Sequence, residues 1–486
     1  MGNVPTITLP ERQNKAKSPA FQATDWLFFV STGNASLACG YENQAFQAFC
    51  KKYLYPKLRF KQILIQMKKI FFSILIAVCL IACSDRMPRH TGDFPIIDVI
   101  GNVGNFQRVY MSEFFSSIEL IPLETGTEFL LDSPTFPVVV MNETVIIMRG
   151  NHQLFAFDRS TGKFLHPIGR RGQGPGEYNW PGTPFFNADK STVFVHDISP
   201  SRIIEFDINN GRHIRTISVP DIEGRLLEPV AQVADNLFIG TRAHTGNYKY
   251  KHHLFDDTGT IVKRFPNHIF FNMPRERAST FHLSLNPMRI DDRLYLKDFV
   301  NDTIYVFRDF EIQPAYVFDF GRFGYPIERL GDAPSSLPYT DLFILRCMVG
   351  TSRFFFYRVR IPDRFPRPRA RPISSPIIGT REPSDVFGIF DKVQNRTILL
   401  DSDQHLQQGF VNDINGGLSF IPRFYAGNGE VVGVWNPEDM MELLTEEYFA
   451  TKTIRDPEGH QRLREVLRNL VWDDNPVIVI ATLKQN

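Results

Sequence analysis

The sequence predicts an all-β fold, a six-bladed β-propeller with two short C-terminal amphipathic helices, and three observations support this prediction. A Phe-Asp pair followed by a glycine turn recurs along the chain at nearly constant steps. The composition, with 13% aromatic residues, 33 Pro and 32 Gly, favours many short strands over long helices. A last apolar stretch at residues 475–484 stands far from the other strands, as expected of a strand that closes a ring.

The repeated unit is an aromatic strand that ends in Phe-Asp, a polar turn that contains glycine, and a returning strand. The pairs fall at Phe157-Asp158, Phe206-Asp207, Phe255-Asp256, Phe307-Arg308 and Phe390-Asp391. The first two steps are 49 residues each and the third is 52. We expect each Asp to accept hydrogen bonds from the amides of its turn, and the glycine to supply the positive φ that the turn requires.

Each of these hairpins follows another pair of apolar strands, so one unit of about 50 residues supplies the four strands of a propeller blade. The predicted blades span residues 135–175, 183–220, 229–267, 283–321, 343–402 and 408–435. Residues 475–484 are expected to pair with residues 118–124 or with the sixth blade. The alternative fold, a pair of β-sandwiches, is less consistent with the constant spacing.

Two amphipathic helices are predicted between the sixth blade and the closing strand, at residues 437–448 and 456–469. The first has Asn436 at its N-cap position, Pro437 in its first turn and acidic residues near its N-terminus. The second places apolar residues on one face at helical spacing, namely Leu463, Val466, Leu467 and Leu470. Both helices are expected to pack on the propeller.

A second start and a lipid-attachment motif are predicted near the N-terminus. Met67 is followed by two lysines and by an apolar run at residues 70–81, which is too short to span a membrane and has the length of a signal-peptide core. The run leads into the sequence LIAC, which resembles the bacterial motif whose cysteine is acylated after cleavage. Cys83 is therefore the predicted lipidation site; the alternative is that residues 70–81 form a buried core segment.

Four segments are expected along the chain. Residues 1–66 lack periodicity and are interpreted as a non-native upstream extension from a misplaced start, because a signal peptide has to lie near the true N-terminus. Residues 67–82 are the signal peptide, residues 83–95 a lipidated tether and residues 96–486 the propeller. The anchor predicts an outer-membrane lipoprotein that faces the periplasm or the cell surface.

Charge and cysteine content limit the class of protein. Residues 1–66 carry a net charge of +5 and residues 67–82 carry +2, which leaves −6 for the remainder of a chain whose total is +1. A mildly acidic body argues against nucleic acid as a partner. Of the five cysteines only Cys83 and Cys347 follow the signal peptide, so no disulfide framework is present. Cys347 is expected to be a small buried side chain.

The stretch GRRGQGPGEY at residues 169–178 occurs once and is the strongest candidate for a ligand site. Its glycine amides allow a ligand to approach closely, and Arg170 and Arg171 are suited to bidentate contacts with carboxylate, sulfate or phosphate. Glu177 and Tyr178 are candidates for contacts with sugar hydroxyls, Tyr178 by stacking. The alternative is structural: the chain crosses tightly between the first two blades, with Glu177 held by backbone amides and Tyr178 packed.

Other candidate residues are weaker. Arg242 and His244 follow a predicted blade strand and are placed at a face of the ring or in its central channel. His252 and His253 are adjacent in a strand and point to opposite faces, so they cannot share a metal and are expected at the surface. Residues 364–376 alternate Pro and Arg and are expected to form an unpaired loop, either solvated or a basic arm for an acidic partner.

No recognised catalytic or metal-binding motif is present, so no catalytic residue, metal ligand or cofactor is predicted.

Three stretches carry a resemblance to a known family. They are IPLETG at residues 121–126, IGRRGQGPGEY at 168–178 and NPVIVIATLK at 475–484. Behind the lipidation motif, they resemble the six-bladed β-propeller lipoproteins of Bacteroidetes, and the hairpins are also similar to those of NHL-like propellers. The resemblance covers roughly residues 83–486 and implies a fold and a location, but no reaction.

The leading functional hypothesis is a lipid-anchored binding or interaction module of the cell envelope, rather than an enzyme. Its partner is expected to be an envelope protein or glycan, its contact with the membrane is the lipid alone, and it is expected to be a monomer. The alternative is a propeller-type lyase or hydrolase that acts on carbohydrate, lactone or peptide. A third hypothesis is a purely structural component of the envelope.

Overall fold

The structure of the chain is a computed structural model. It describes residues 94–131, 139–150, 152–187, 189–224, 227–242, 247–272, 285–298, 300–329, 339–375, 379–381 and 383–485. The predicted upstream extension, the signal peptide, the lipidation site Cys83 and the candidate His244 lie outside the described residues.

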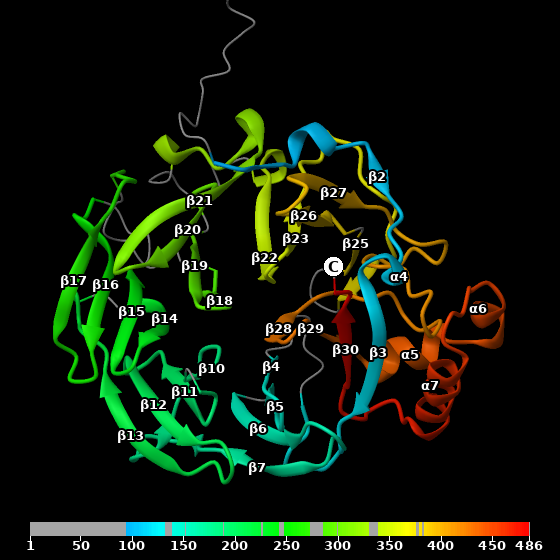
Figure 1. Ribbon diagram of the computed structural model, residues 1–486, viewed down its shortest axis with the longest axis horizontal. Helices are drawn as coiled ribbons and strands as arrows, with labels where there is room; N and C mark the ends of the chain where they lie inside the picture. The colour runs from blue at the N-terminus through cyan, green and yellow to red at the C-terminus, as the bar shows by residue number, and fades with distance from the viewer. Residues whose placement is uncertain are drawn as a thin grey trace, which may run out of the picture. The chain divides into compact units, whose positions relative to one another are not determined.

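The described residues form six sheets of four or five strands that stand as blades around a central axis, as Figure 1 shows. Blade 1 contains β4 (Val139–Met141), β5 (Val145–Gly150), β6 (Gln153–Asp158) and β7 (Phe164–Ile168). Blade 2 contains β10 (Phe185–Phe186), β11 (Thr192–Asp197), β12 (Arg202–Asp207) and β13 (His213–Ser218). Blade 3 contains β14 (Leu227–Ala234), β15 (Leu237–Arg242), β16 (Tyr250–Asp256) and β17 (Ile261–Pro266).

The second half of the ring has the same sheet order. Blade 4 contains β18 (Met288–Ile290), β19 (Arg293–Lys297), β20 (Thr303–Arg308) and β21 (Glu311–Asp319). Blade 5 contains β22 (Ile344–Gly350), β23 (Phe354–Arg360), β26 (Asp385–Asp391) and β27 (Arg396–Leu400). Blade 6 contains β28 (Phe424–Gly427), β29 (Glu430–Trp435), β30 (Val477–Leu483) and β3 (Phe115–Pro122). The six-bladed propeller that the repeat predicts is confirmed.

The ring is closed by strands from the two ends of the propeller. β30 pairs with β29 on one side and with β3 on the other, with Ile118 opposite Ala481 and Ile121 opposite Ile478. Both partners expected for the closing strand are therefore present in one sheet. The sixth blade nevertheless starts at Phe424 rather than near residue 408, because residues 401–423 cross from blade 5 to blade 6.

An N-terminal arm wraps around the rim of the ring, which the sequence did not predict. β1 (Ile96–Asp98) pairs in parallel with β21 of blade 4, and β2 (Phe106–Gln107) pairs in parallel with β27 of blade 5. Between these two strands the segment forms η1 (Ile100–Asn102), and after β2 it forms α4 (Met111–Phe114) before it enters β3. The arm thus adds a strand to three consecutive blades.

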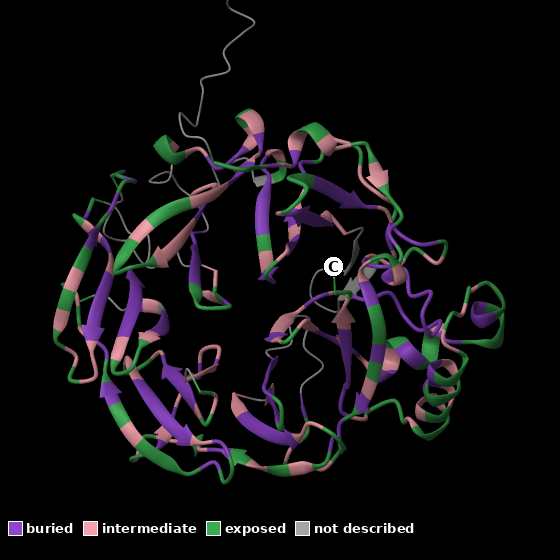
Figure 2. Cartoon of the chain, viewed as in Figure 1, coloured by how far each residue is buried: buried purple, intermediate pink, exposed green. Residues whose placement is uncertain are grey.

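The apolar core is distributed over the interfaces between neighbouring blades. Phe157 and Ile478 belong to the cluster between blades 6 and 1, for example, while Phe194 and Phe238 belong to the one between blades 2 and 3. Figure 2 shows buried residues along the inner strands and exposed residues along the rim. The outermost strands β7, β13 and β17 alternate accordingly between covered and exposed side chains. Each blade is therefore stabilised mainly by its two neighbours.

The repeated Asp-Gly turns have the predicted chemistry. Asp158 accepts hydrogen bonds from the Thr161 and Ser160 amides at 2.8 and 3.0 Å, and from both hydroxyls. Gly162 has φ +72°. A Cβ on Gly162 would lie 2.0 Å from the Pro122 carbonyl oxygen, so only glycine fits there.

The first two of these turns also hold the preceding blade. The Gly162 carbonyl accepts a hydrogen bond of 2.9 Å from the Glu124 amide, just after the outermost strand of blade 6. One blade later, Gly211 (φ +67°) would place a Cβ 2.0 Å from the Pro167 carbonyl oxygen, and its own carbonyl accepts from the Gly169 amide. We call this repeated contact the rim latch. It joins neighbouring blades through the backbone.

Because neighbouring strands of a blade are antiparallel, the two ends of the blade carry different sets of connecting loops. The turns between strands one and two are short in all six blades, and those between strands three and four are short in blades 1 to 5; in blade 6 the third and fourth strands are not joined by a turn. At the opposite end lie the loops between strands two and three and the crossings to the next blade, which we together call the crossing face. It carries the long segments 169–184, 361–384, 401–423 and 436–476.

Short elements lie within the crossing-face segments, including the crossing from blade 4 to blade 5. They are β8 (Arg170–Arg171), β9 (Glu177–Tyr178), β24 (Ile373–Ser375), β25 (Gly379–Arg381), η3 (Gly321–Phe323), η4 (Ile327–Arg329) and η6 (Tyr339–Asp341). Because β24 and β25 pair, the expectation that residues 364–376 form an entirely unpaired loop is wrong at its C-terminal end. Its arginines contact acids of the same chain, since Arg364 pairs with Asp341 at 2.9 Å and Arg371 pairs with Glu442.

The C-terminal helical insertion contains three helices, α5 (Pro437–Leu443), α6 (Glu446–Ala450) and α7 (Pro457–Asn469). The single helix predicted at residues 437–448 is broken at Leu444, because Thr445 starts a new helix by capping the Tyr448 amide. The second predicted helix is confirmed, with Leu463 fully buried and Val466, Leu467 and Leu470 packed on the blade 5–blade 6 core. In the described part of the chain no helix is long and apolar enough to cross a membrane.

Candidate functional site

The glycine-rich stretch forms the start of the crossing from blade 1 to blade 2. β8 and β9 pair in parallel, with Arg170 opposite Glu177 and Arg171 opposite Tyr178. The structure therefore brings the four candidates of this stretch into one short strand pair. Arg242, at the end of β15 in blade 3, belongs to a different part of the crossing face.

Glu177 is held from inside the loop. Its carboxylate accepts 2.8 Å from the Gly174 amide and 2.6 Å from Arg170 Nε. These contacts, the Gly174 amide first and the Arg170 guanidinium second, lower the pKa of Glu177. The Arg170 side chain is 78% exposed and Glu177 only 18%. Arg170 thus serves the loop and still presents its guanidinium to solvent.

Tyr178 has a packing role. It is fully buried, and its hydroxyl donates 2.7 Å to the Ile168 carbonyl while it accepts from the Leu154 amide and from Gln153 Nε2, both at 3.0 Å. Burial raises the pKa of Tyr178. A ring with no exposed surface cannot stack on a ligand, so Tyr178 has the structural role that was given as the alternative. Glu177 has mainly the same kind of role, because its carboxylate is held within the loop. Arg171 and Arg170 are the exposed candidates of the stretch, and only Arg170 is engaged with Glu177.

Arg242 is enclosed between blades rather than directed into an open channel. Its side chain is 9% exposed, contacts Glu223 at 3.0 Å and lies 4.5 Å from the centre of the Tyr248 ring. Its backbone carbonyl accepts 2.7 Å from Lys251 Nζ, and Lys251 pairs with Asp298 of blade 4 at 3.2 Å. Burial lowers the pKa of Lys251. The Arg242 side chain thus contacts the crossing from blade 2 to blade 3, while its carbonyl is connected to blade 4 through Lys251.

The adjacent residues His252 and His253 were both expected at the surface, but His253 is buried. His253 is 1% exposed, and its Nδ1 has no hydrogen-bond partner. His252 Nδ1 lies 2.9 Å from the Thr241 hydroxyl. They do point to opposite sides of β16, as the alternation of a strand requires. The surface prediction fails for His253 because β16 is the third strand of its blade, and the face of β16 that carries His253 and Phe255 packs against blade 2.

A group of arginines in blades 5 and 6 was missed by sequence reasoning. Arg346 and Arg358 contact the two oxygens of Asp385 at 3.6 and 3.4 Å. Arg358 lies opposite Cys347 in the sheet, and Arg423 precedes β28 in the neighbouring blade. The charged residues within the otherwise apolar strands ILRCMVG and FFFYRVR were the available signal.

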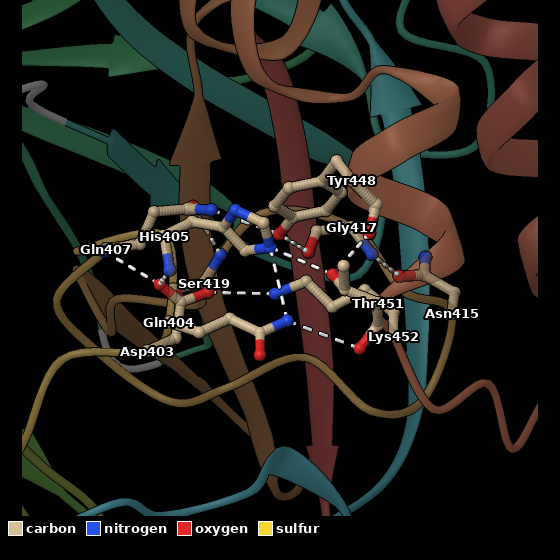
Figure 3. A network of polar contacts seen from close by, with 10 residues as sticks. All are labelled: Asp403, Gln404, His405, Gln407, Asn415, Gly417, Ser419, Tyr448, Thr451 and Lys452. Atoms are coloured by element: carbon tan, nitrogen blue, oxygen red, sulfur yellow. Dashed lines mark hydrogen bonds and ion pairs between the residues drawn. The ribbon is translucent and has the colours of Figure 1, made fainter.

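A second missed feature joins the helical insertion to the crossing between blades 5 and 6 (Figure 3). Lys452 and Asp403 form an ion pair of 2.8 Å in which both side chains are almost fully buried. The Tyr448 hydroxyl donates 2.8 Å to the Gly417 carbonyl and accepts from Gln407 Nε2 at 3.0 Å. No local pattern marks these residues, because their partners come from segments outside the repeat.

An open groove of about 780 Å³ lies between α7 and the rim strand β3. Leu120, Val466 and Leu470 give it apolar walls, and Glu119 and Arg462 also line it. Beyond the end of α7, the Trp472 side chain is exposed. The groove is a further concave surface of the described residues.

The fold and the enclosed polar clusters define a six-bladed β-propeller whose longest segments emerge from one end of the blades. The chain belongs to the family described as a domain of unknown function, DUF4934, whose model matches residues 94–482. No curated protein matches the chain at a significant level.

Two solved structures illustrate the similarity. A candidate exported protein from Bacteroides fragilis is 14% identical, with a TM-score of 0.57 over 80% of this chain and all of that one. A member of the DUF4221 family from Bacteroides vulgatus is 12% identical, with a TM-score of 0.46 over 76% of this chain and 97% of that one. The first similarity supports the fold.

Proposed function

We propose that this protein is a lipid-anchored propeller of the cell envelope that binds a partner on its crossing face. The observation that carries the proposal is the difference between the two ends of the blades. Short turns occupy one end, whereas the segments at residues 169–184, 361–384, 401–423 and 436–476 emerge at the other. Loops carried by a rigid scaffold are where binding residues concentrate.

The proposed location rests on the sequence motif around Cys83. It is supported by the exported character given to the similar Bacteroides fragilis protein. An acylated Cys83 would tether the propeller to the outer membrane, facing the periplasm or the cell surface. The test is mass spectrometry of the membrane fraction. We expect an N-terminal peptide that begins at a lipid-modified Cys83, and an unmodified N-terminus upstream of Met67 would contradict the anchor.

The proposed partner is an envelope protein or a glycan. Arg171 is exposed beside β9 on the crossing face and reaches solvent, so it is the natural position for a probe. The propeller is proposed as a monomeric binding module, similar in its hairpins to NHL-like propellers. Among the described residues no group of three His, Cys, Asp or Glu side chains lies close enough to hold a metal ion.

Site-specific photo-crosslinking in cells tests the binding face. A photo-reactive residue at position 171 should give a discrete adduct, whereas one at Val393 should not. Val393 lies in a turn at the other end of blade 5 with 74% of its surface exposed, so it controls for accessibility. Equal adducts at both positions, or adducts at Val393 alone, would contradict the proposed face.

A further inference from the structure

Three arginines lie where blades 5 and 6 meet on the crossing face. Arg346 belongs to β22, Arg358 to β23 and Arg423 to the residue before β28. β22 and β28 are the innermost strands of their sheets, so the cluster lies beside the central axis of the ring (Figure 1). Arg346 and Arg358 are positioned by regular strands, and Arg423 lies one residue before β28.

The cluster contains more positive than negative charge. Asp385 is shared by Arg346 at 3.6 Å and by Arg358 at 3.4 Å. Within the described chain, Arg423 has neither an ion pair nor a side-chain hydrogen bond to protein. Burial and the nearby Arg358 charge lower the pKa of Arg423, although the thiol of Cys347 acts in the opposite direction. Arg423 therefore adds a further guanidinium to the two that share Asp385.

Other arginines of the crossing face have acidic partners of their own. Arg364 contacts Asp341 at 2.9 Å, and Arg367 contacts Asp363 at 3.1 Å. Arg423 is partly covered by protein and lacks such an acid. Placing a guanidinium in a partly desolvated position beside another guanidinium is unfavourable unless an anion compensates the charge. The uncompensated positive charge of Arg423 is thus an energetic cost that a bound anion would remove.

The cluster is also open to a ligand. Arg346 is 38% exposed, and Arg423 retains part of its surface. The apolar space beneath it, lined by Cys347, Phe387 and Pro422, is only about 10 Å³ and does not admit an anion. An oxyanion would therefore sit on the outer side of the guanidinium groups, where planar donors can make paired hydrogen bonds.

We infer that Arg423, together with Arg358 and Arg346, binds an oxyanion group, such as a carboxylate, sulfate or phosphate, of the ligand that the crossing face receives. The inference rests on the proposed function, because it names the chemistry of the ligand on that face. Arg423 supplies the charge that Asp385 leaves uncompensated. Arg358 and Arg346 contribute the positive field around it.

Thermal unfolding of the full chain tests this site with simple probes. Inorganic phosphate, sulfate and acetate are titrated at constant ionic strength against chloride. We expect the wild-type Tm to rise with at least one oxyanion. In Arg423→Gln the apparent affinity should fall about tenfold or more, because a charge-assisted contact is lost. Comparison of the three probes distinguishes a phosphate or sulfate site from a carboxylate site.

Two further variants separate binding from folding. Arg364→Gln removes an arginine that has its own acid, and it should retain the wild-type response to the oxyanion. Arg423→Lys keeps the charge without the planar donors, and it should bind several-fold more weakly than wild type. In chloride alone, Arg423→Gln should unfold at the wild-type temperature or above it, because an uncompensated charge has been removed. A purely structural arginine would instead lower the Tm.

The inference is overturned if no oxyanion raises the wild-type Tm, or if Arg423→Gln keeps the full response. An equal loss in Arg364→Gln would also overturn it, because the effect would then be one of general surface charge. Its failure is distinguishable from failure of the proposed function. Anion binding without an adduct at position 171 would remove the partner proposal, whereas an adduct that Arg423→Gln leaves unchanged would remove the anion site.

Discussion

Single residues in this propeller are constrained most strongly where two backbone segments are in close contact. Gly162 combines a positive φ with a carbonyl oxygen 2.0 Å from where a side chain would begin. Tyr178 offers its hydroxyl to three partners in a fully buried position. In both cases the residue type follows from geometry rather than from a ligand.

Gly162→Ala should lower the free energy of unfolding by about 2–4 kcal/mol, because it adds steric displacement of the rim latch to backbone strain. Gly224→Ala is the matched control. Gly224 has the same φ of +72°, but nothing lies within 4 Å of the place where a Cβ would stand, so its cost should be about 1 kcal/mol. Urea denaturation measures both values, and equal costs would show that the latch contributes nothing beyond the turn conformation.

Two buried histidines should make the protein sensitive to acid. Burial lowers the pKa of His196 to about 4, and burial with the Arg264 and Arg242 charges lowers that of His253 to about 4. Between pH 6.5 and 4 the unfolded chain therefore binds more protons than the native state, so stability falls as pH falls through this window. The loss should reach roughly 2–3 kcal/mol for each group near pH 4.

The histidine prediction is checked by unfolding at several pH values. His253→Gln should flatten the dependence between pH 6.5 and 4, whereas His213→Gln, on an exposed position of β13, should leave it unchanged. An unchanged slope in His253→Gln would contradict the contribution of that residue.

At the scale of elements, the helical insertion is held to the ring by a buried polar network. α6 and the residues that follow it supply Tyr448 and Lys452, and the crossing from blade 5 supplies Asp403 and Gln407. A buried ion pair fixes how two segments meet more than it adds stability, and removing one partner leaves an uncompensated charge.

Lys452→Met should therefore destabilise the protein by about 3–5 kcal/mol. Combining it with Asp403→Asn should recover part of the loss, because the isolated buried charge is removed. Arg462→Met is the control, since Arg462 is 60% exposed and its ion pairs are long. Thermal unfolding compares the three, and similar effects of Lys452→Met and Arg462→Met would contradict the role of the buried pair.

The elements that could be predicted from the sequence are those that form because of residues close to one another in the chain. The Phe-Asp strands, their glycine turns and α7 each carry their signal within a few residues. The break between α5 and α6 was missed, since Thr445 competes with a continuous apolar pattern. The pairing of β24 with β25 was masked by the alternation of Pro and Arg upstream of it.

The candidate site was less predictable than the fold for a physical reason. The loop at residues 169–178 could be located, but whether Tyr178 faces a ligand or the core depends on Ile168 and Leu154 of the adjacent strands. The group formed by Arg346, Arg358 and Arg423 depends on the register of blade 5, which residues 361–384 interrupt. Such contacts arise only when distant segments are placed side by side.

At the scale of the whole propeller, the N-terminal arm and β30 determine how the ring is closed. β1 and β2 lie on the outer edges of blades 4 and 5, whereas β3 is an integral strand of blade 6. Loss of the first two should uncover the edges of β21 and β27. Loss of β3 should also open the cores on both sides of blade 6, because Ile118 and Ile121 belong to different clusters.

A truncation series measures this difference. A chain that starts at Tyr110 should remain folded with a lower Tm, whereas a chain that starts at Leu123 should lose its cooperative transition and aggregate through the exposed edge of β30. Circular dichroism and size-exclusion chromatography report the two outcomes. A stable monomer without β3 would contradict the proposed closure.

The rim latch has a consequence for how the sequence can change in length. An extra residue in the turn from Asp158 to Gly162 would move the glycine away from the Pro122 carbonyl and loosen two blades at once. A segment such as residues 361–384 returns to the same blade without any latch, and lengthening a loop costs only about 0.6 kcal/mol per doubling. One rim of the ring is thus closed to insertion, while the opposite face can acquire new surface without disturbing the blades beneath it.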